Sequence, residues 1–317
     1  MVGVRLDTCR SKAPAKIILF GEHFVVYGVP ALAAAVGLYA RVVAKRATCN
    51  SSIICSTAIG VCEPTSKLDR LKHLAPIAKI MDEDNKIVAL IDSDIPIGAG
   101  LGSSAAIAVA LAAAVRGLVH GEIDRTLVLK DAFEVEKIVH GKPSGIDNTV
   151  SCYGGFILYS PQGILERINT RITGIKILVA YTGIRRSTRD AVERVKALRV
   201  RFMRIFSCLE EAVRNIVDEA LQALTRGDVV KLGELMNINH GLLSAIGVST
   251  PELEELVYLA RKAGALGAKI TGAGLGGSII ALAWEDDAKK IHNVLERKAA
   301  KVFILDLGVD GVSLECY

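Results

Sequence analysis

Glycines and serines come together in the segment PIGAGLGSSAAIAVALAAAV, residues 96–115, where a loose turn leads into a long apolar helix. The first N–H groups of a helix have no partner inside the helix, and the helix dipole makes that end partly positive. Glycine lets an anion approach these N–H groups because no Cβ is in the way. Ser103 and Ser104 add hydroxyls that can bind a phosphate or ligate Mg²⁺. The segment therefore predicts phosphate binding.

The same segment matches neither of the common phosphate-loop patterns. It lacks the G-K-[ST] ending of a Walker A loop, and Ser103 stands where G-x-G-x-x-G has its third glycine. The alternative is a tight corner in the core, followed by a buried helix with a serine N-cap. Three glycines and two serines are more than a cap requires, which favours the binding of an anion.

Ionisable residues also occur in KAPAKIILFGEHFVVYGVPAL, residues 12–32, where Glu22 and His23 lie between two apolar runs. Burying two consecutive ionisable groups is costly unless they have partners. Lys16 lies in the predicted strand that precedes them. Considered singly, Lys16 could be a surface lysine on an edge strand and His23 a satisfied turn histidine. Their grouping favours a polar site.

Two carboxylates stand out in DAFEVEKIVHGKPSGIDNTV, residues 131–150. On a helix, Glu136 would have apolar neighbours one turn away, namely Ala132, Phe133 and Val139. A carboxylate on an apolar face needs a cation, and Mg²⁺ is suitable. Asp147 follows in a Pro–Ser–Gly turn, which would expose its side chain at a defined angle, although an ordinary Asx turn is an equal alternative.

A second glycine-rich segment, KITGAGLGGSIIAL, has Gly272, Gly274 and Gly277 at the G-x-G-x-x-G spacing. A strand-like run follows where that motif requires a helix, so we reject dinucleotide binding and the oxidoreductase function that it would imply. A glycine hairpin and a glycine loop that closes over a ligand both remain open.

The elements that must position these residues change in character along the chain. Strands are expected at 16–20, on both sides of a polar turn at 50–52, at 86–96 and at 156–160, with helices after the first glycine segment and at 127–140. From residue 176, a strand, helices over 188–225, through 236–240 and after Pro251, two strands around the second glycine segment, a helix at 286–299 and a last strand at 301–308 are expected. This order predicts a second α+β unit that begins near residue 170.

Composition limits the classes of function. The chain has 317 residues, 51% of them apolar, and a formal net charge of +5 without a dense basic block. These features argue against nucleic acid as a partner and suit a small anionic substrate. No signal peptide is visible, and glycines and serines make residues 96–115 a poor membrane span, so we expect a cytoplasmic protein without a membrane partner.

Cysteine usage gives a further expectation. The seven cysteines form no C-x-x-C pair, which argues against a metal cluster or a secreted disulfide framework. A local disulfide among Cys49, Cys55 and Cys62 is conceivable, but we expect buried free thiols.

Taken together and in this order, the segments resemble the galactokinase, homoserine kinase, mevalonate kinase and phosphomevalonate kinase (GHMP) superfamily over nearly the whole chain. Three motifs carry the resemblance: PAKIILFGEH, PIGAGLGSSAA and KITGAGLGGS. Within the superfamily, FGEHFVVYG, EKIVHGKPSGIDNTVSCYGG and MNINHGLLSAIGVSTPELEEL are similar to compact archaeal or bacterial mevalonate kinases. The resemblance implies the α+β GHMP kinase fold, with an N-terminal nucleotide-binding α+β domain (1–170) and a C-terminal ferredoxin-like α+β domain (171–317).

The resemblance also implies residue roles. Asp147 would be the catalytic base, assisted by Lys16, and Ser104 and Glu136 would hold Mg²⁺. The ATP-binding loop would comprise Pro96, Gly98, Ala99, Gly100, Leu101, Gly102, Ser103 and Ser104. The substrate side would comprise Glu22, His23, Thr188, Gly272 and Gly274. Leu275 stands where this second loop usually has glycine, which puts the loop's flexibility in question.

The implied activity is the ATP- and Mg²⁺-dependent phosphorylation of (R)-mevalonate to 5-phosphomevalonate in isoprenoid biosynthesis. Family members are often homodimers. Phosphomevalonate kinase or mevalonate 3-kinase is the alternative, because Arg185, Arg186 and Arg189 could bind a substrate phosphate. A non-catalytic ligand sensor is disfavoured because Lys16 and the two carboxylates are all present.

Overall fold

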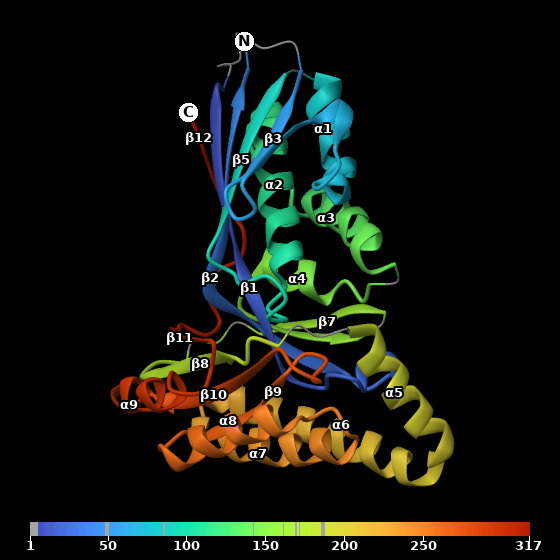
Figure 1. Ribbon diagram of the computed structural model, residues 1–317, viewed down its shortest axis with the longest axis vertical. Coiled ribbons are helices and arrows are strands. Elements are labelled where there is room, and N and C mark those ends of the chain that lie inside the picture. The colour runs from blue at the N-terminus through green and yellow to red at the C-terminus, as the bar shows by residue number, and fades with distance from the viewer. Residues whose placement is uncertain are drawn as a thin grey trace.

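The protein is built from two sheets, each covered by helices. The computed structural model describes residues 6–317 apart from 48–50, 85, 142, 161, 169, 171 and 185–187 (Figure 1). The strands of the first sheet are β1 (Thr8–Phe20), β2 (Ala31–Arg46), β3 (Ile53–Ser56), β4 (Val61–Pro64), β5 (Ile87–Ser93), β6 (Phe156–Ser160), β7 (Gly163–Ile168) and β12 (Ser313–Cys316). The second sheet contains β8 (Ile175–Tyr181), β9 (Gly267–Thr271), β10 (Ser278–Trp284) and β11 (Lys301–Leu305).

The strand order brings distant parts of the chain together. The first sheet has the order β12-β1-β2-β5-β3-β4, with β6 paired to β2 and β7 to β6. Its pairs are antiparallel except for β3 with β5. The second sheet is antiparallel, with the order β11-β8-β10-β9. We call the first sheet and its helices the first unit, and the second sheet and its helices the second unit.

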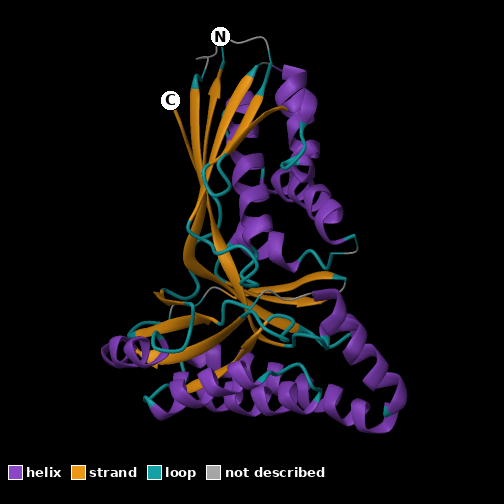
Figure 2. Ribbon diagram, in the orientation of Figure 1, coloured by secondary structure: helices purple, strands orange, loops and turns teal. Residues whose placement is uncertain are grey.

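Helices lie against one side of each sheet (Figure 2). The first unit has α1 (Ala75–Asp84), α2 (Ser103–His120), α3 (Arg125–His140) and α4 (Ile146–Tyr153). The second has α5 (Thr188–Arg201), α6 (Met203–Arg226), α7 (Val229–Ala245), α8 (Pro251–Lys262) and α9 (Glu285–Leu295). In the first unit α2 and α4 contact β1 and β2, and α1 and α3 pack on α2. In the second unit α7, α8 and α9 pack on the sheet.

The long strands β1 and β2 connect the two units. Burial in β1 alternates from Thr8 to Lys12 and is then continuous from Ala13 to Phe20, because that part is covered on both faces. Besides α2 and α4, both strands also contact α6 of the second unit. Strands β1 and β2 therefore contact helices of both units and run through the region where the units meet.

Helix α2 is the core helix of the first unit. Alanine, valine and leucine make up most of its buried residues, and small side chains allow the helix to lie close to the sheet. By length and composition alone it could cross a membrane, but most of it is buried inside the protein. Burial in the core accounts for its apolar character.

Most predicted elements are confirmed, but three regions differ. Asp147 lies in the first turn of α4 rather than in a turn, because the left-handed Gly145 (φ 82°) ends the turn and caps that helix. The strand at 301–308 does not end the chain, since β12 follows it and pairs with β1. The elements α1, β4 and β7 were not predicted.

The prediction of free thiols is wrong for four cysteines. Cys55 is bonded to Cys62, and Cys9 is bonded to Cys316. In each pair the two residues lie directly opposite on neighbouring antiparallel strands, which brings their Cβ atoms close enough for a disulfide. The spacing of Cys9 and Cys316 in the sequence does not indicate a bond, because only the pairing of β1 with β12 brings them together.

The remaining cysteines differ in exposure. Cys152 is a buried free thiol and Cys208 an exposed one. Cys49 lies outside the described residues.

Candidate active site

A cavity of about 990 Å³ lies where β1, the start of α2, α3, α4 and α5 meet the loop between β9 and β10. The predicted site residues that line it are Lys16, Glu22, His23, Pro96, Gly98, Gly100, Gly102, Ser103, Ser104, Glu136, Asp147, Thr188 and Gly272. The fold therefore gathers residues from five separate stretches of the sequence into one space.

Lys16 and Asp147 form an ion pair at the wall of this cavity. The Nζ of Lys16 is 3.0 Å from Oδ1 of Asp147, and the exposed fractions of the two side chains are 5% and 25%. Strand β1 carries the lysine, and the first turn of α4 carries the aspartate. A hydroxyl that enters the cavity can therefore meet a carboxylate whose neighbour is a nearly buried ammonium group.

The first glycine segment lies next to this ion pair. Gly98, Gly100 and Gly102 all have positive φ, at 81°, 81° and 74°, which residues with a Cβ rarely adopt. A Cβ on Gly102 would lie 3.1 Å from Cγ of Lys16 and 3.5 Å from Oδ2 of Asp147. Glycine is thus required both by the backbone and by the close approach of the ion pair.

The start of α2 carries no side-chain cap from the described residues. Gly102 takes the N-cap position, so the alternative of a serine N-cap is wrong. The Ser103 hydroxyl instead lies 3.4 Å from the carbonyl of Ile95. The first N–H groups of the helix therefore have no side-chain cap among the described residues, and such groups at a helix start suit an anion.

Two residues predicted in this loop do not line the cavity. The side chains of Ala99 and Leu101 are buried in the core, with exposed fractions of 0% and 1%. The Ala99 carbonyl accepts a hydrogen bond from Ser278, and the Leu101 carbonyl accepts one from the Lys16 N–H. Their contribution is to fix the loop, because alternate residues of this turn face inward.

Glu136 is buried, as its apolar helical neighbours predicted, with 5% of its surface exposed. Its Oε2 accepts a hydrogen bond of 2.6 Å from Asn148 Nδ2. Burial, reinforced by the negative charge of Asp147 and opposed by Lys16, raises the pKa of Glu136 to about 8. A carboxyl group in this position is suited to a divalent cation, which would replace its proton.

The donor set fits Mg²⁺ held mainly by substrate. Among the described residues there is no cluster of three or more carboxylate, histidine or cysteine ligands. Glu136, Ser103 and Ser104 nevertheless line the same cavity. Mg²⁺ is commonly bound by one or two protein groups together with phosphates and waters, so this sparse set is sufficient.

Glu22 finds its partner in a residue that the sequence analysis missed. Lys269 in β9 donates to a Glu22 carboxylate oxygen, and both side chains are almost fully buried. Burial raises the pKa of Glu22 and lowers that of Lys269, and the attraction between their charges opposes both shifts. The only sequence signal was a lysine inside the apolar strand GAKIT, which by itself suggests no partner.

His23 is held in a restricted conformation beside Glu22. Its φ is 65°, an unusual value for a residue with a Cβ. Its ring Nε2 lies 3.0 Å from the carbonyl oxygen of Ala273, in the loop between β9 and β10. The histidine therefore connects the first unit to the second glycine segment at the cavity wall.

The second glycine segment only partly faces the cavity. Gly272 lines it, but Gly274 does not, since a Cβ at Gly274 would lie 2.3 Å from the carbonyl oxygen of Val248. Leu275 adopts φ 55°, the left-handed conformation that glycine would take without strain. The Leu275 N–H donates to the Val248 carbonyl at 2.7 Å, and this bond holds the loop between β9 and β10 against the segment that precedes α8.

Thr188 begins α5 and lines the cavity together with Arg189. Arg185 and Arg186, considered above as ligands for a substrate phosphate, lie outside the described residues. Of the three arginines, the structure thus places only Arg189.

Comparison with known proteins agrees with this architecture. The family model described as GHMP kinases N terminal domain matches residues 69–155, and the one described as GHMP kinases C terminal matches residues 208–301. The mevalonate kinases of Pyrococcus abyssi (strain GE5 / Orsay) and Aeropyrum pernix are 41% and 37% identical. Each alignment covers 96% of this chain, and 97% and 98% of the respective relative.

Solved structures give the same result. The L. major mevalonate kinase in complex with R-mevalonate has a TM-score of 0.85 and 30% identity, and the match covers 95% of this chain and 96% of that one. The Methanococcus jannaschii mevalonate kinase has a TM-score of 0.84 and 26% identity, and covers 97% and 99%.

The two family models together match more than half of the chain, and the relatives are similar along nearly all of it. The cavity combines a glycine loop at an uncapped helix start with a lysine–aspartate pair, an arrangement suited to phosphoryl transfer. This chain is a kinase that belongs to the GHMP kinase family, among the mevalonate kinases.

Proposed function

We propose that this chain transfers the γ-phosphoryl group of ATP to the C5 hydroxyl of (R)-mevalonate, forming 5-phosphomevalonate and ADP. The observation that carries the proposal is the 3.0 Å ion pair of Lys16 and Asp147 beside the first glycine segment. The similarity to mevalonate kinases, one of them solved with R-mevalonate, supports the choice of acceptor.

Asp147 is the proposed base that accepts the proton of the substrate hydroxyl. Lys16 keeps this carboxylate in position and attracts the negative charge that spreads over the transferred phosphoryl group. Phosphoryl transfer needs positioning and charge stabilisation more than covalent catalysis. Once ATP is aligned with the acceptor hydroxyl, Lys16 and Asp147 therefore supply the side-chain chemistry that the transfer needs.

The glycine segment is the proposed binding site for the ATP phosphates. The N–H groups around Gly98, Gly100 and Gly102 and the start of α2 would hold the phosphate oxygens, with Ser103 at the rim. Glu136 and Ser104 would hold Mg²⁺, which neutralises phosphate charge when bound. The buried carboxyl of Glu136 supports this role, because a cation would compensate its desolvation.

Mevalonate is expected at the opposite wall of the cavity, near Glu22, His23, Thr188 and Gly272. The fixed ring of His23 is suited to orient the carboxylate or hydroxyls of the substrate.

A domain division near residue 170, a homodimer and a cytoplasmic location remain predictions. Strand β12 falls within the predicted second domain by residue number, but it pairs with β1 in the first sheet.

An acceptor panel tests the substrate. With ATP and Mg²⁺, we expect turnover of mevalonate and little turnover of 5-phosphomevalonate, measured as release of ADP and identified by mass spectrometry of the product. Preferential turnover of 5-phosphomevalonate would instead assign Arg189 to a substrate phosphate and overturn the proposal. Phosphorylation at the 3-hydroxyl would favour a mevalonate 3-kinase.

Asp147→Asn tests the base. We expect kcat to fall by at least about 10²-fold while ATP binding is largely kept, because the amide cannot accept the proton. Steady-state ADP release and ATP titration measure the two effects. Asp286→Asn is the matched control, since Asp286 is also an aspartate in the first turn of a helix but lies exposed on α9. Unchanged turnover in Asp147→Asn would exclude the assigned role.

A further inference from the structure

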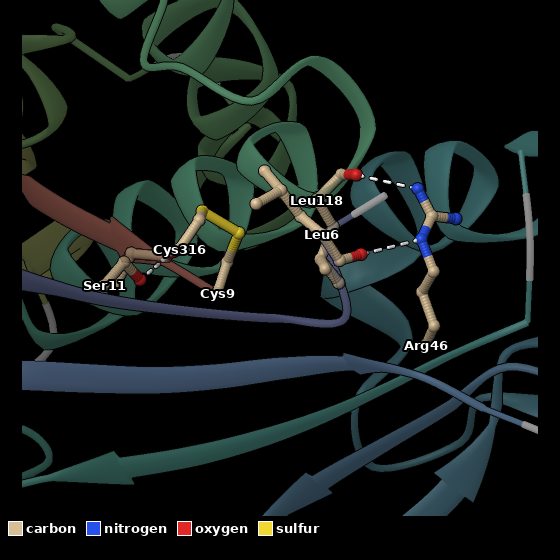
Figure 3. Close-up of a disulfide and its surroundings, with 7 residues drawn as sticks. Leu6, Cys9, Ser11, Arg46, Leu118 and Cys316 are labelled. Carbon is tan, nitrogen blue, oxygen red and sulfur yellow. Dashed lines mark hydrogen bonds between the residues drawn. A yellow bond between two sulfur atoms is a disulfide. The ribbon is translucent and has the colours of Figure 1, made fainter. Parts of the chain in front are cut away.

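The two described ends of the chain meet at one edge of the first sheet, where a disulfide joins them (Figure 3). Cys9 in β1 and Cys316 in β12 are separated by 307 positions in the sequence. The bond therefore closes almost the whole chain into one covalent loop. Cys9 is fully buried, and Cys316 is partly accessible.

Strand β12 is short and lies at the edge of its sheet. It pairs with β1 over four residues, at the edge of the sheet. Short edge strands and chain ends separate readily from a sheet, and their departure exposes unpaired N–H and C=O groups on the neighbouring strand. Loss of β12 would uncover this edge of β1.

The same strand packs against the far end of α2. A Cβ on Gly117 would lie 2.6 Å from Cδ2 of Leu314 and 3.1 Å from Sγ of Cys316, so the helix and the strand are in close contact there. Arg46 donates to the carbonyls of Leu6 at 3.0 Å and Leu118 at 2.8 Å, which ties the start of the chain to the last turn of α2 (Figure 3).

These contacts link the disulfide to the helix that begins at the glycine segment. The Ser11 hydroxyl donates to the Ala110 carbonyl at 2.6 Å, a further bond between β1 and α2. The contacts of Leu314, Cys316 and Arg46 thus hold α2 near the end opposite the cavity, at Gly117 and Leu118, which lie 14 and 15 positions after Ser103.

We propose that the Cys9–Cys316 bond is a redox-dependent lock that keeps β12 against β1 and α2 and sets the thermal stability of the chain. Its formation removes two electrons and two protons from the two cysteine thiols. A small disulfide oxidant such as glutathione disulfide accepts them and is thereby reduced to two glutathione thiols. Reduction reverses this exchange and begins at Cys316, because Cys9 is inaccessible.

The second disulfide provides an internal comparison. Cys55 and Cys62 are only 7 positions apart, in the hairpin of β3 and β4. A cross-link restricts the unfolded chain more strongly the longer the loop that it closes. The Cys9–Cys316 bond should therefore contribute more to thermal stability than the Cys55–Cys62 bond.

Thermal unfolding of full-length protein with and without dithiothreitol tests this ranking, in a Cys208→Ser background that removes the exposed thiol. We expect reduction to lower the Tm of the parent by roughly 5–10 °C. Cys55→Ala/Cys62→Ala should keep most of this reductant-dependent fall. Cys9→Ala/Cys316→Ala should start at the lower Tm and change much less. An equal fall in both double variants would overturn the proposal.

Two further measurements hold even if a variant fails to fold, because they use the parent protein. Alkylation of the denatured, unreduced protein should spare Cys9 and Cys316, and peptide mapping should recover their peptides joined; labelling of both thiols would overturn the proposal. On reduction, hydrogen exchange should rise in β12 and in the last turns of α2, whereas kinase turnover at 25 °C stays within about twofold. Unchanged exchange there would contradict the lock.

Discussion

Glu136 is a buried carboxyl group, and it belongs to none of the ion pairs found among the described residues. Its pKa, about 8 in the folded chain, is well above the ordinary value of 4.5 that the unfolded chain would show. Between these values the folded state binds a proton that the unfolded state does not, so the stability contributed by this site falls as pH rises through this window. Ionisation in the folded chain is therefore a cost that Mg²⁺ would relieve.

Glu136→Gln should remove this cost. Without Mg²⁺, we expect the variant to have a higher free energy of unfolding than the parent at pH 9, by about 2–5 kcal/mol, and the difference to shrink toward pH 5. The glutamine can still accept the hydrogen bond from Asn148. Urea denaturation at both pH values measures the difference, and ATP turnover should be lost.

Glu134→Gln is the control for this experiment. Glu134 lies on the same helix but is exposed and paired with Lys137 at 2.7 Å. Its removal should change the free energy of unfolding by no more than about 0.5 kcal/mol at either pH. A pH trend equal to that of Glu136→Gln would show that the effect is not specific to the buried carboxyl.

The surroundings of a site residue could be predicted from the sequence where a single helix or turn determines them. The burial of Glu136 followed from apolar residues spaced one helical turn away, and the turn before α2 followed from its glycines. The partner of Glu22 did not follow, because Lys269 is 247 positions distant and only the packing of β9 against β1 brings them together.

At the scale of the element, the glycine segment is shaped by the backbone conformation that its glycines permit. Gly102→Ala would place a Cβ 3.1 Å from Lys16 Cγ and force a left-handed alanine. We expect a loss of about 1–2 kcal/mol in stability from the backbone and, because Lys16 must shift, a fall in kcat and a rise in the KM for ATP. Steady-state kinetics and thermal unfolding separate these effects.

Gly60→Ala is the matched control, since Gly60 also has positive φ (63°) but a Cβ there would meet nothing within 4 Å. It should lose similar stability and keep full turnover. If both variants keep full activity, the close approach of the loop to Lys16 has no catalytic importance.

Elements with strong periodicity or clear glycine and proline boundaries were predicted from the sequence, as α3, α8 and β10 show. The four-residue strand β12 was missed, because SLEC has no distinctive pattern and is a strand only through its pairing with β1. Helix α4 was missed because its eight residues follow a Pro–Ser–Gly sequence that also suits a turn.

At the scale of the whole molecule, the buried ion pair of Glu22 and Lys269 joins the loop after β1 to the second sheet. Lys269→Met leaves a buried carboxylate without its partner and should lower the free energy of unfolding by about 3–5 kcal/mol. Glu22→Gln/Lys269→Met, which removes both charges, should recover most of this loss. Urea denaturation provides the double-mutant comparison.

Lys289→Met is the control, because Lys289 is exposed on α9. It should stay within about 0.5 kcal/mol of the parent. If the double variant is as unstable as Lys269→Met, the pair stabilises the protein through packing rather than charge.

The closure of the chain at Cys9 and Cys316 also determines how the protein would bear a mechanical load. A pull applied at its two ends would act first on the hydrogen bonds between Asp7, Thr8 and Tyr317, and then directly on the sulfur–sulfur bond. Residues 10–315 would feel no tension while that bond is intact. After reduction, the same pull could extend the chain by on the order of 100 nm.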